Sequence, residues 1–220
     1  SMNQDYMYCN TEPVGSFQNL LIVADGMGGH RAGDYASRLC VETMVQSLEK
    51  SAHKTPVSLF EEAVTAANKA VFEESASHVE YEGMGTTVVA CTLEENTLYI
   101  ANIGDSRLYL IRDGIEQITD DHSLVEEMVK QGNITESEAR IHPQKNIITR
   151  ALGINEEVQA DFFEIDVEQG DVIMLCSDGL SNMIEDEDME YIVKNSDTLQ
   201  TAAESLVARA NENGGNDNIT

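Results

Sequence analysis

The stretch that decides the fold is LLIVADGMGG, residues 20–29, in which an apolar strand runs directly into Asp25 and a glycine-rich turn. A second stretch, VIMLCSDG at residues 172–179, repeats the pattern with Asp178. A third acid, Asp217, lies in GGNDN at residues 214–218. Buried strands that end in carboxylates can gather them at one edge of a sheet, where they repel one another unless a cation lies between them. The sequence therefore predicts a site for a hard divalent cation.

Composition limits the classes of function. The 220 residues include 40 acidic side chains against 13 Lys and Arg, which gives a formal net charge of −27. This length fits one domain with a sizeable core, so we predict a single domain over residues 1–220. The negative charge repels phosphate backbones and anionic membranes, so we expect no nucleic-acid partner and no membrane partner. The four cysteines form no C-x-x-C pair and no apolar run approaches 18 residues, which favours a cytoplasmic location.

Hydrophobic periodicity places helices towards both ends of the chain and strands between them. Helical spacing predicts helices over residues 31–50, from Pro56 onward and over 198–213. Shorter apolar runs predict strands at residues 18–24, 87–91, 98–101, 108–111, 162–167 and 172–176. Capping boxes at Ser123 and Thr135 predict two short helices in a surface excursion. This segregation predicts an α+β fold of antiparallel sheets covered by helices, not a doubly wound parallel sheet.

The Asp-Gly pairs could mark turns only, or they could belong to a metal site. A single such pair usually marks only a turn, but here it occurs twice at strand ends. Glycines allow backbone carbonyls to approach a cation, as Mg²⁺ and Mn²⁺ sites with few carboxylates require. Two ions about 4 Å apart could share a water, lower its pKa and direct it at phosphorus. A cysteine phosphatase is excluded, because no cysteine is followed six residues later by Arg, and no phosphate-binding loop of an NTPase is present.

Eight short motifs follow one another along the chain. They are NQD (3–5), ADGMGGH (24–30), GMGTT (83–87), NIGDSR (102–107), DHSL (121–124), ITRALG (148–153), SDGL (177–180) and GNDNI (215–219). In this order they resemble the bacterial branch of the metal-dependent (type 2C, PPM) serine/threonine protein phosphatases, and the resemblance covers nearly the whole chain. It implies an αββα sandwich of two antiparallel sheets with two Mn²⁺ or Mg²⁺ ions between them at one end. The implied reaction is hydrolysis of phosphoserine and phosphothreonine in proteins, with a cognate Ser/Thr kinase among the expected partners.

The resemblance also assigns roles to individual residues. Asp25 matches the carboxylate that bridges the two metals, and the carbonyl of Gly26 matches a further ligand. Asp178 and Asp217 match the other carboxylate ligands, and these three aspartates form the predicted catalytic centre. Asp105 matches the acid that helps Asp178 to hold a third, weaker metal. Asp5 matches an acid that holds metal-bound waters, and residues 123–150 match the flap beside the site.

Two departures from the family pattern lead to further expectations. In the family an Arg before the Asn3 position grips the substrate phosphate, and strands precede and follow the stretch seen here. We therefore expect a domain truncated at both ends, with weakened activity and with sheet edges left exposed or paired with a neighbour. Met27 occupies the position of a His that is the proposed general acid in eukaryotic relatives. The leaving group must then receive its proton from another donor.

Several alternatives remain open at this point. The chain could be a truncated pseudophosphatase that binds metals or partners without turnover. It could also be the phosphatase part of a signalling sensor, although the sequence carries no sensor segment, which makes this alternative less consistent. His122 could belong to the local flap structure or to a proton relay. His30 could be a surface or capping residue or a functional contact. Arg107 is expected to orient Asp105.

Overall fold

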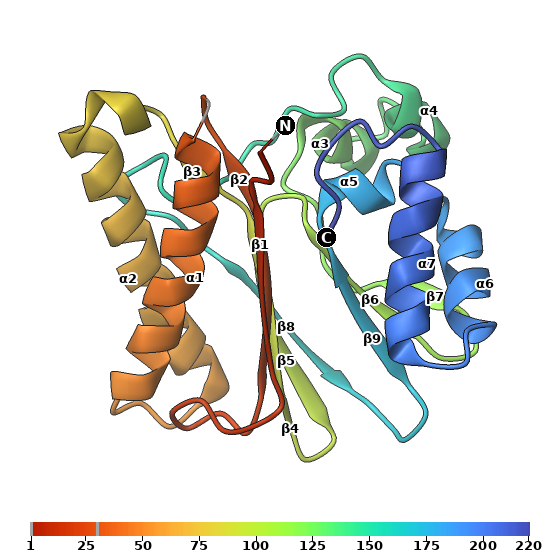
Figure 1. Ribbon diagram of the computed structural model, residues 1–220, viewed down its shortest axis with the longest axis horizontal. Coiled ribbons are helices and arrows are strands. Elements are labelled where there is room, and N and C mark those ends of the chain that lie inside the picture. The colour runs from red at the N-terminus through yellow and green to blue at the C-terminus, as the bar shows by residue number, and fades with distance from the viewer. Residues whose placement is uncertain (1, 30) are drawn as a thin grey trace.

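The computed structural model describes residues 2–29 and 31–220, so His30 lies outside the described residues. Two antiparallel sheets face each other, and helices cover the outer face of each (Figure 1). The layers follow the order helix, sheet, sheet, helix. The predicted αββα sandwich is therefore confirmed.

The larger sheet has the strand order β1-β2-β4-β5-β8, and the short β3 pairs with β2. The smaller sheet has the order β7-β6-β9. Every ladder is antiparallel. The strands are β1 (Asp5–Asn10), β2 (Leu20–Met27), β3 (Gly85–Thr86), β4 (Val88–Glu94), β5 (Thr97–Ile103), β6 (Arg107–Ile111), β7 (Ile115–Gln117), β8 (Asp161–Asp166) and β9 (Val172–Cys176).

Helices from the start of the chain cover the larger sheet, and helices from its end cover the smaller one (Figure 1). The first group is α1 (Ala32–Lys50) and α2 (Pro56–Ser77), followed by the one-turn η1 (Val79–Tyr81). The second group is α5 (Asp178–Ser181), α6 (Asp186–Lys194) and α7 (Leu199–Glu212). Between them, α3 (Leu124–Lys130) and α4 (Glu136–Ile141) form the flap, which stands at the top of Figure 1. Among the described residues, no helix combines the length and apolarity needed to cross a membrane.

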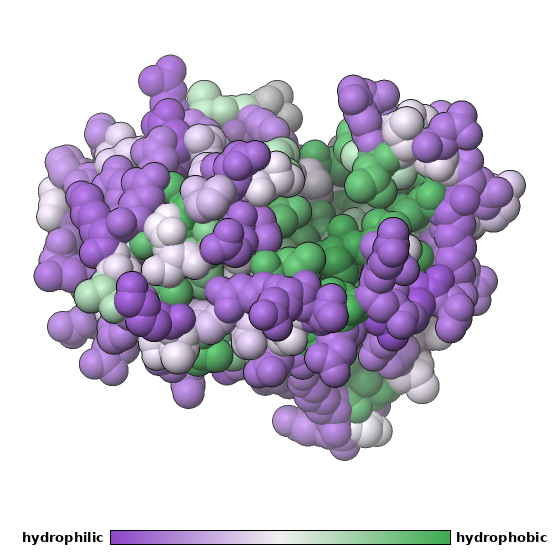
Figure 2. Space-filling model, turned by 90° about the horizontal axis from the view of Figure 1, so that it is seen from below, coloured by the Kyte–Doolittle hydropathy of each residue, from purple (hydrophilic) through white to green (hydrophobic). Residues whose placement is uncertain are grey.

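Strand alternation divides the apolar side chains between two layers. On β2, Leu20 and Ile22 pack towards the helices, whereas Leu21 and Val23 face the other sheet. Seen from below, hydrophobic residues gather in the hollow between the two helix-covered halves (Figure 2). By the same alternation, Asp25 follows Leu21 and Val23 onto the face between the sheets. The strand thus delivers a carboxylate to the inner layer at its upper end.

The structure corrects some details of the predicted elements. β2 does not stop before Asp25 but continues to Met27, and Asp5 lies directly opposite Asp25 in the ladder with β1. β1 is not among the predicted strands, and apart from Asp5 its residues DYMYCN are only half-buried or exposed. The Ser123 side chain accepts from the N–H of Glu126, but only Thr135 forms the full reciprocal capping box with Glu138.

One buried amide fixes the loop that follows the flap, and its loss has an expected cost. The Asn68 side chain accepts from the N–H of Gly153 at 2.7 Å and donates to the carbonyls of Asn155 and Glu156 at 3.0 and 2.9 Å. Asn68→Ala would leave these backbone groups without their partner, so we expect a loss of about 2–4 kcal/mol in the free energy of unfolding. Urea denaturation measures the change. Lys69→Ala on the exposed face of the same helix is the control, and an equal effect there would contradict this role.

Candidate metal centre

Five aspartates from distant parts of the chain converge at the upper end of the space between the sheets. Asp5 and Asp25 face each other on neighbouring strands of the larger sheet. Asp178 is the first residue of α5, directly after β9 of the smaller sheet. Asp105 lies in the turn between β5 and β6, and Asp217 lies in the loop after α7. Asp25 and Asp217 both lie near Asp178, and the two sheets each contribute to this edge.

The convergence is visible in the protonation of the acids. Burial, followed by the negative charges of Asp5 and Asp178, raises the pKa of Asp25 to about 10. Burial and the charge of Asp178 raise the pKa of Asp105 to about 8. Burial also raises the pKa values of Asp5 and Asp178, and the charge of Asp217 adds to both. Carboxylates that lie this close demand positive charge, either as protons or as a cation.

The negative charge of the cluster is not balanced by an ion pair among the described residues. In the described part of the chain, none of the five aspartates forms an ion pair with Lys, Arg or His. Among residues 2–29 and 31–220, Asp5 Oδ1 and Asp178 Oδ1 are buried oxygens that have no hydrogen-bond partner. Such oxygens are costly unless a ligand satisfies them. These residues fit a hard cation, which takes oxygen ligands.

The side chains are not yet arranged as a closed coordination shell. Within residues 2–29 and 31–220, no group of three or more His, Cys, Asp or Glu side chains has the geometry of a ready metal site. Asp25 instead comes within hydrogen-bonding reach of Asp5 and Asp178, a contact between carboxyls that requires a shared proton. Asp217 is the exposed member of the cluster. The ligand roles of the five aspartates and of Gly26 therefore stay predictions.

Backbone packing brings Gly26 into the site. A Cβ at Gly26 would lie 1.8 Å from the carbonyl oxygen of Gly33, so only glycine allows α1 to begin this close to β2. The Gly26 N–H donates to the carbonyl of Gln4 at 3.0 Å, which ties the chain just before β1 to the same turn. The glycine-rich turn thus brings the start of α1 against the strand that carries Asp25.

Small hydroxyl residues that sequence reasoning did not single out hold the acids in place. Ser177 donates to Asp5 Oδ2 at 2.8 Å, and its hydroxyl accepts from the N–H of Thr220 at 3.1 Å. Thr87 Oγ1 accepts from the N–H of Asp25 at 3.0 Å and lies 2.7 Å from Ser106 Oγ. These residues occur in the quoted motifs, but a lone Ser or Thr gives no signal of such a contact.

The expected role of Arg107 is wrong. Its guanidinium forms a two-pronged pair with Asp121, at 2.9 Å from Nε to Oδ1 and 2.7 Å from Nη2 to Oδ2, and donates to the Tyr109 hydroxyl at 2.8 Å. No hydrogen bond or ion pair between Arg107 and Asp105 is present in the described residues. The guanidinium is thus paired with the acid beside the flap, and it acts on Asp105 only through its charge, which opposes the rise in the pKa of that carboxyl.

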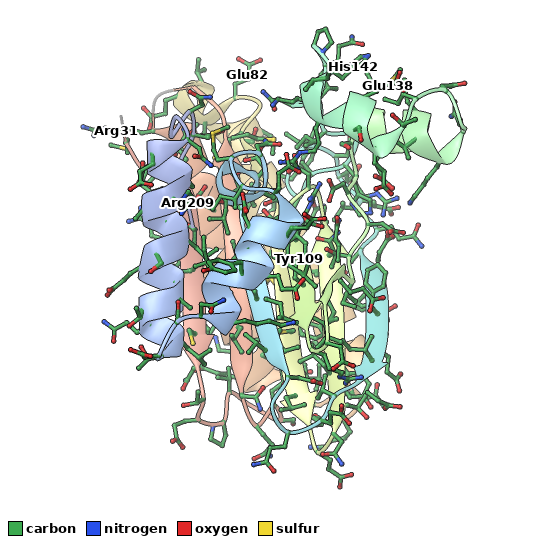
Figure 3. All side chains as sticks on the ribbon, turned by 90° about the vertical axis from the view of Figure 1, so that its right-hand side faces the viewer. Arg31, Glu82, Tyr109, Glu138, His142 and Arg209 are labelled. Carbon is green, nitrogen blue, oxygen red and sulfur yellow. The ribbon has the colours of Figure 1, made fainter. Side chains whose placement is uncertain are left out.

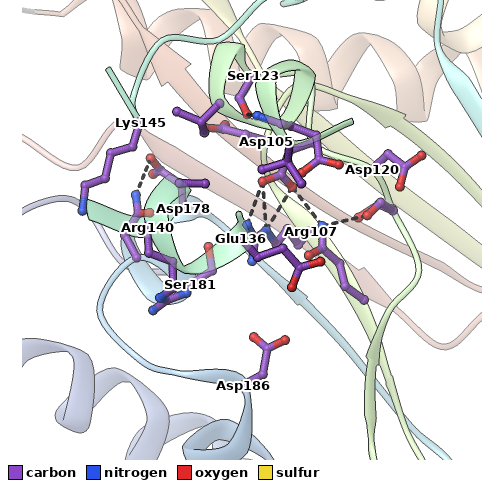
Figure 4. Close-up of a pocket in the computed structure, with 18 of the residues that line it drawn as sticks. Asp105, Arg107, Asp120, Ser123, Glu136, Arg140, Lys145, Asp178, Ser181 and Asp186 are labelled. Atoms are coloured by element: carbon purple, nitrogen blue, oxygen red, sulfur yellow. Dashed lines mark hydrogen bonds and ion pairs between the residues drawn. The ribbon is translucent and has the colours of Figure 1, made fainter. Parts of the chain in front are cut away.

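A pocket of about 630 Å³ opens from the cluster towards the flap (Figure 4). Asp105 and Asp178 line it on the side of the cluster, and Arg140 and Lys145 line it from the flap. Arg140 pairs with Glu185 at 2.8 Å. The pocket is large enough for a phosphorylated side chain and part of its peptide. The flap thus forms one wall of the approach to the acids.

The raised pKa values predict an unusual pH dependence for the metal-free protein. An aspartate in an unfolded chain titrates near about 3.9, well below the pKa values of about 8 and about 10 at Asp105 and Asp25. A folded-state pKa above the unfolded one means that the stability due to the bound proton is present at low pH and is lost as the pH rises towards the folded value. In EDTA we therefore expect the free energy of unfolding to fall between roughly pH 5 and pH 9. Urea unfolding at several pH values measures this slope, and Asp105→Asn should make it shallower; an unchanged slope would count against the charge cluster.

The fold and the carboxylate cluster together define a class of protein: an αββα sandwich with acids that suit divalent cations at one edge, between the two sheets. Comparison with known proteins then identifies the family within this class. The sequence profile described as Protein phosphatase 2C matches residues 1–216. The chain belongs to this family.

Named relatives agree with the assignment. The serine/threonine phosphatase stp of Listeria monocytogenes serotype 4b is 40% identical over 221 residues, covering 96% of this chain and 88% of that protein. Protein phosphatase PhpP of Streptococcus pneumoniae serotype 2 is 40% identical over 222 residues, covering 99% and 89%. The two relatives therefore match almost the whole of the present chain.

Solved structures share the fold. The Mycobacterium tuberculosis serine/threonine phosphatase PstP/Ppp superposes with a TM-score of 0.89 at 36% identity, covering 100% of this chain and 90% of that one. Stp1 of Staphylococcus aureus gives a TM-score of 0.91 at 32% identity, covering 100% and 87%. A catalytic domain of PstP solved with two manganese ions gives 0.86 at 34% identity, covering 100% and 89%. Family members thus include a protein that holds two divalent ions.

Proposed function

We propose that this chain hydrolyses phosphoserine and phosphothreonine in proteins with the help of two Mn²⁺ or Mg²⁺ ions. The observation that carries the proposal is the gathering at one edge of the sandwich of five aspartates that form no ion pair among the described residues. Two of them have buried oxygens for which these residues offer no hydrogen-bond partner. Membership of the protein phosphatase 2C family and the two manganese ions in the related PstP structure support it. Mn²⁺ is the ion that we propose first.

Different residues of the chain would have different roles at the metal centre. Asp25, Asp178 and Asp217, with the carbonyl of Gly26, would hold two ions, and Asp105 would help Asp178 to hold a third. When bound, the ions supply a water of lowered pKa and stabilise charge on the phosphoryl oxygens. Asp5, held by Ser177, would accept hydrogen bonds from waters at the centre. Met27 carries no proton to donate, so this side chain does not protonate the leaving group.

The partners follow from the reaction. Phosphoproteins are the proposed substrates, and a Ser/Thr kinase is proposed as a partner because the reaction needs an enzyme that supplies its substrate. We propose a cytoplasmic location, supported by the four free thiols, of which Cys40, Cys91 and Cys176 are buried. Burial raises the pKa of each of these three thiols to about 12, which keeps them protonated and unreactive.

Phosphate release separates the enzyme from a pseudophosphatase. We expect a phosphothreonine peptide to release phosphate with Mn²⁺, to release none with EDTA, and a phosphotyrosine peptide of the same sequence to react far more slowly. A pseudophosphatase would bind the peptide, as measured by fluorescence anisotropy, without release. Binding without turnover at saturating Mn²⁺ would overturn the proposed function.

A further inference from the structure

His122 lies at the junction between the flap and the carboxylate cluster. It is 7% exposed and precedes α3. Its backbone N–H donates to the carbonyl of Gly104 at 2.9 Å, and its carbonyl accepts from the N–H of Thr149 at 2.9 Å. Ser123 forms an isolated bridge with Ile148, so the two ends of the flap are joined next to this histidine. His122 therefore contacts both the turn that carries Asp105 and the end of the flap.

The two hydrogen bonds of the His122 ring define its tautomer. Nδ1 accepts from the N–H of Gly104 at 2.9 Å, and a backbone N–H can only donate, so Nδ1 carries no proton. Nε2 must then carry the proton and donate it to Asp161 Oδ2 at 2.7 Å. Asp161 Oδ1 accepts from Arg150 Nη1 at 2.9 Å. A chain of contacts thus runs from Gly104 through the imidazole and β8 to the last residue of the flap.

Gly104 is held on its opposite side as well. Its backbone has φ +102, a conformation that favours glycine, and an added Cβ would lie 2.6 Å from Thr87 Cγ2. The two bonds from His122 fix both its N–H and its carbonyl. The next residue is Asp105, whose side chain reaches the cluster from this turn while the residue remains only 8% exposed. The position of that carboxylate therefore depends on the ring.

We propose that His122 is a positioning residue that sets Asp105 through Gly104 and couples it to the base of the flap through Asp161 and Arg150. The proposal rests on the proposed function, because the position of Asp105 matters to binding only where the acids take up cations. It decides between the two roles open to His122. A proton relay would need the ring to reach the reacting atoms, but both ring nitrogens are already engaged away from the pocket. A purely local role in the flap would leave Asp105 unaffected.

Two substitutions of His122 by amide side chains test the contacts of Nδ1 and Nε2 separately. In His122→Asn the amide can take the place of Nδ1 and still accept from Gly104, whereas the contact with Asp161 is lost. In His122→Gln the amide reaches the place of Nε2 and can still donate to Asp161, whereas the acceptor for Gly104 is lost. We expect His122→Gln to weaken the weakest Mn²⁺ binding step roughly tenfold, and His122→Asn to change it by less than about threefold. Isothermal titration calorimetry with MnCl₂ measures the binding without any need for turnover.

A double-mutant cycle tests whether the effect passes through Asp105. In the Asp105→Asn background, His122→Gln should no longer change Mn²⁺ binding, because the carboxylate that it positions is gone. The half-saturating Mn²⁺ concentration for peptide hydrolysis should rise in parallel, with a smaller change in KM for the peptide. His142→Gln is the matched control, since this half-buried flap histidine accepts locally from the N–H of Gln144 and makes no bond to the site among the described residues (Figure 3).

The outcomes distinguish the inference from the function on which it rests. Equal effects of both His122 variants, no effect of either, or an effect that persists with Asp105→Asn would each overturn the positioning role while leaving the phosphatase intact. Failure of the wild-type protein to bind Mn²⁺ would overturn the proposed function and the inference together. If thermal melting shows that His122→Gln does not fold, Asp161→Ala takes its place. It removes the outer partner of the ring but leaves Nδ1 free to accept from Gly104, so we expect it, like His122→Asn, to change the same binding step by less than about threefold. A tenfold loss in Asp161→Ala would show that the contact with Asp161, not the one with Gly104, sets Asp105, and would overturn the proposal.

Discussion

Asp178→Asn is expected to lower Mn²⁺-supported hydrolysis of a phosphothreonine peptide by roughly a thousandfold, the largest effect of any single change considered for this chain. Asp178 is the acid that the other members of the cluster share: its charge raises the pKa values of both Asp25 and Asp105. The amide keeps the shape of the side chain but removes the charge that a cation needs. Phosphate release at saturating Mn²⁺ measures the loss.

The same variant should become more stable when metal is absent. Removing one of the crowded carboxylates relieves repulsion, so in EDTA at pH 8 the midpoint of thermal unfolding should rise, whereas added Mn²⁺ should stabilise it less than it stabilises the wild type. Asp120→Asn is the control, because this carboxylate lines the same pocket but pairs with Lys130. Retention of activity in Asp178→Asn, or an equal loss in Asp120→Asn, would refute the assigned centre.

Gly26→Ala is expected to cost about 3–5 kcal/mol in the free energy of unfolding, a large effect for one added methyl group. Its Cβ would meet the Gly33 carbonyl oxygen at 1.8 Å and the Gln4 carbonyl oxygen at 2.8 Å. Both are backbone atoms, which cannot swing aside as a side chain would. Either β2 and α1 must separate or the turn must rebuild, and both changes would move Asp25.

A neighbouring glycine provides the control for this steric argument. Gly29 lies in the same turn, and nothing lies within 4 Å of the Cβ that Gly29→Ala would add. That variant should unfold within about 1 kcal/mol of the wild type, since only the glycine's own flexibility is lost. Urea denaturation of both variants compares them directly. Equal stabilities for the two variants would show that the close contact at Gly26 is relieved at little cost.

The sequence predicted those features that follow from local pattern. Alternation and helical spacing placed the inner strands and the long helices correctly, because their apolar residues recur at the period of the element that buries them. β1 is missed, since it is an edge strand whose side chains other than Asp5 are half-buried or exposed, so no buried aliphatic run marks it. β2 also continues beyond Asp25, because Gly26 and Met27 pair with the short strand β3, which lies far away in sequence.

The supporting contacts of the site could not be predicted in the same way. Arg107 is the first residue of β6, and its pairing with Asp121 instead of Asp105 depends on where the chain after β7 places Asp121. Ser177 and Thr87 act through single hydroxyl groups that no spacing announces. Motifs indicated which acids to examine, whereas the tertiary structure determines which residues hold them.

The aspartates come from both sheets, and this has a mechanical consequence. Asp5 and Asp25 belong to the larger sheet, whereas Asp178 follows the smaller one. A divalent ion bound by all of them would link the two sheets at this edge. Removal of that ion would allow the sheets to separate there, so the opening motion of the sandwich would depend on the concentration of the cation in the cell.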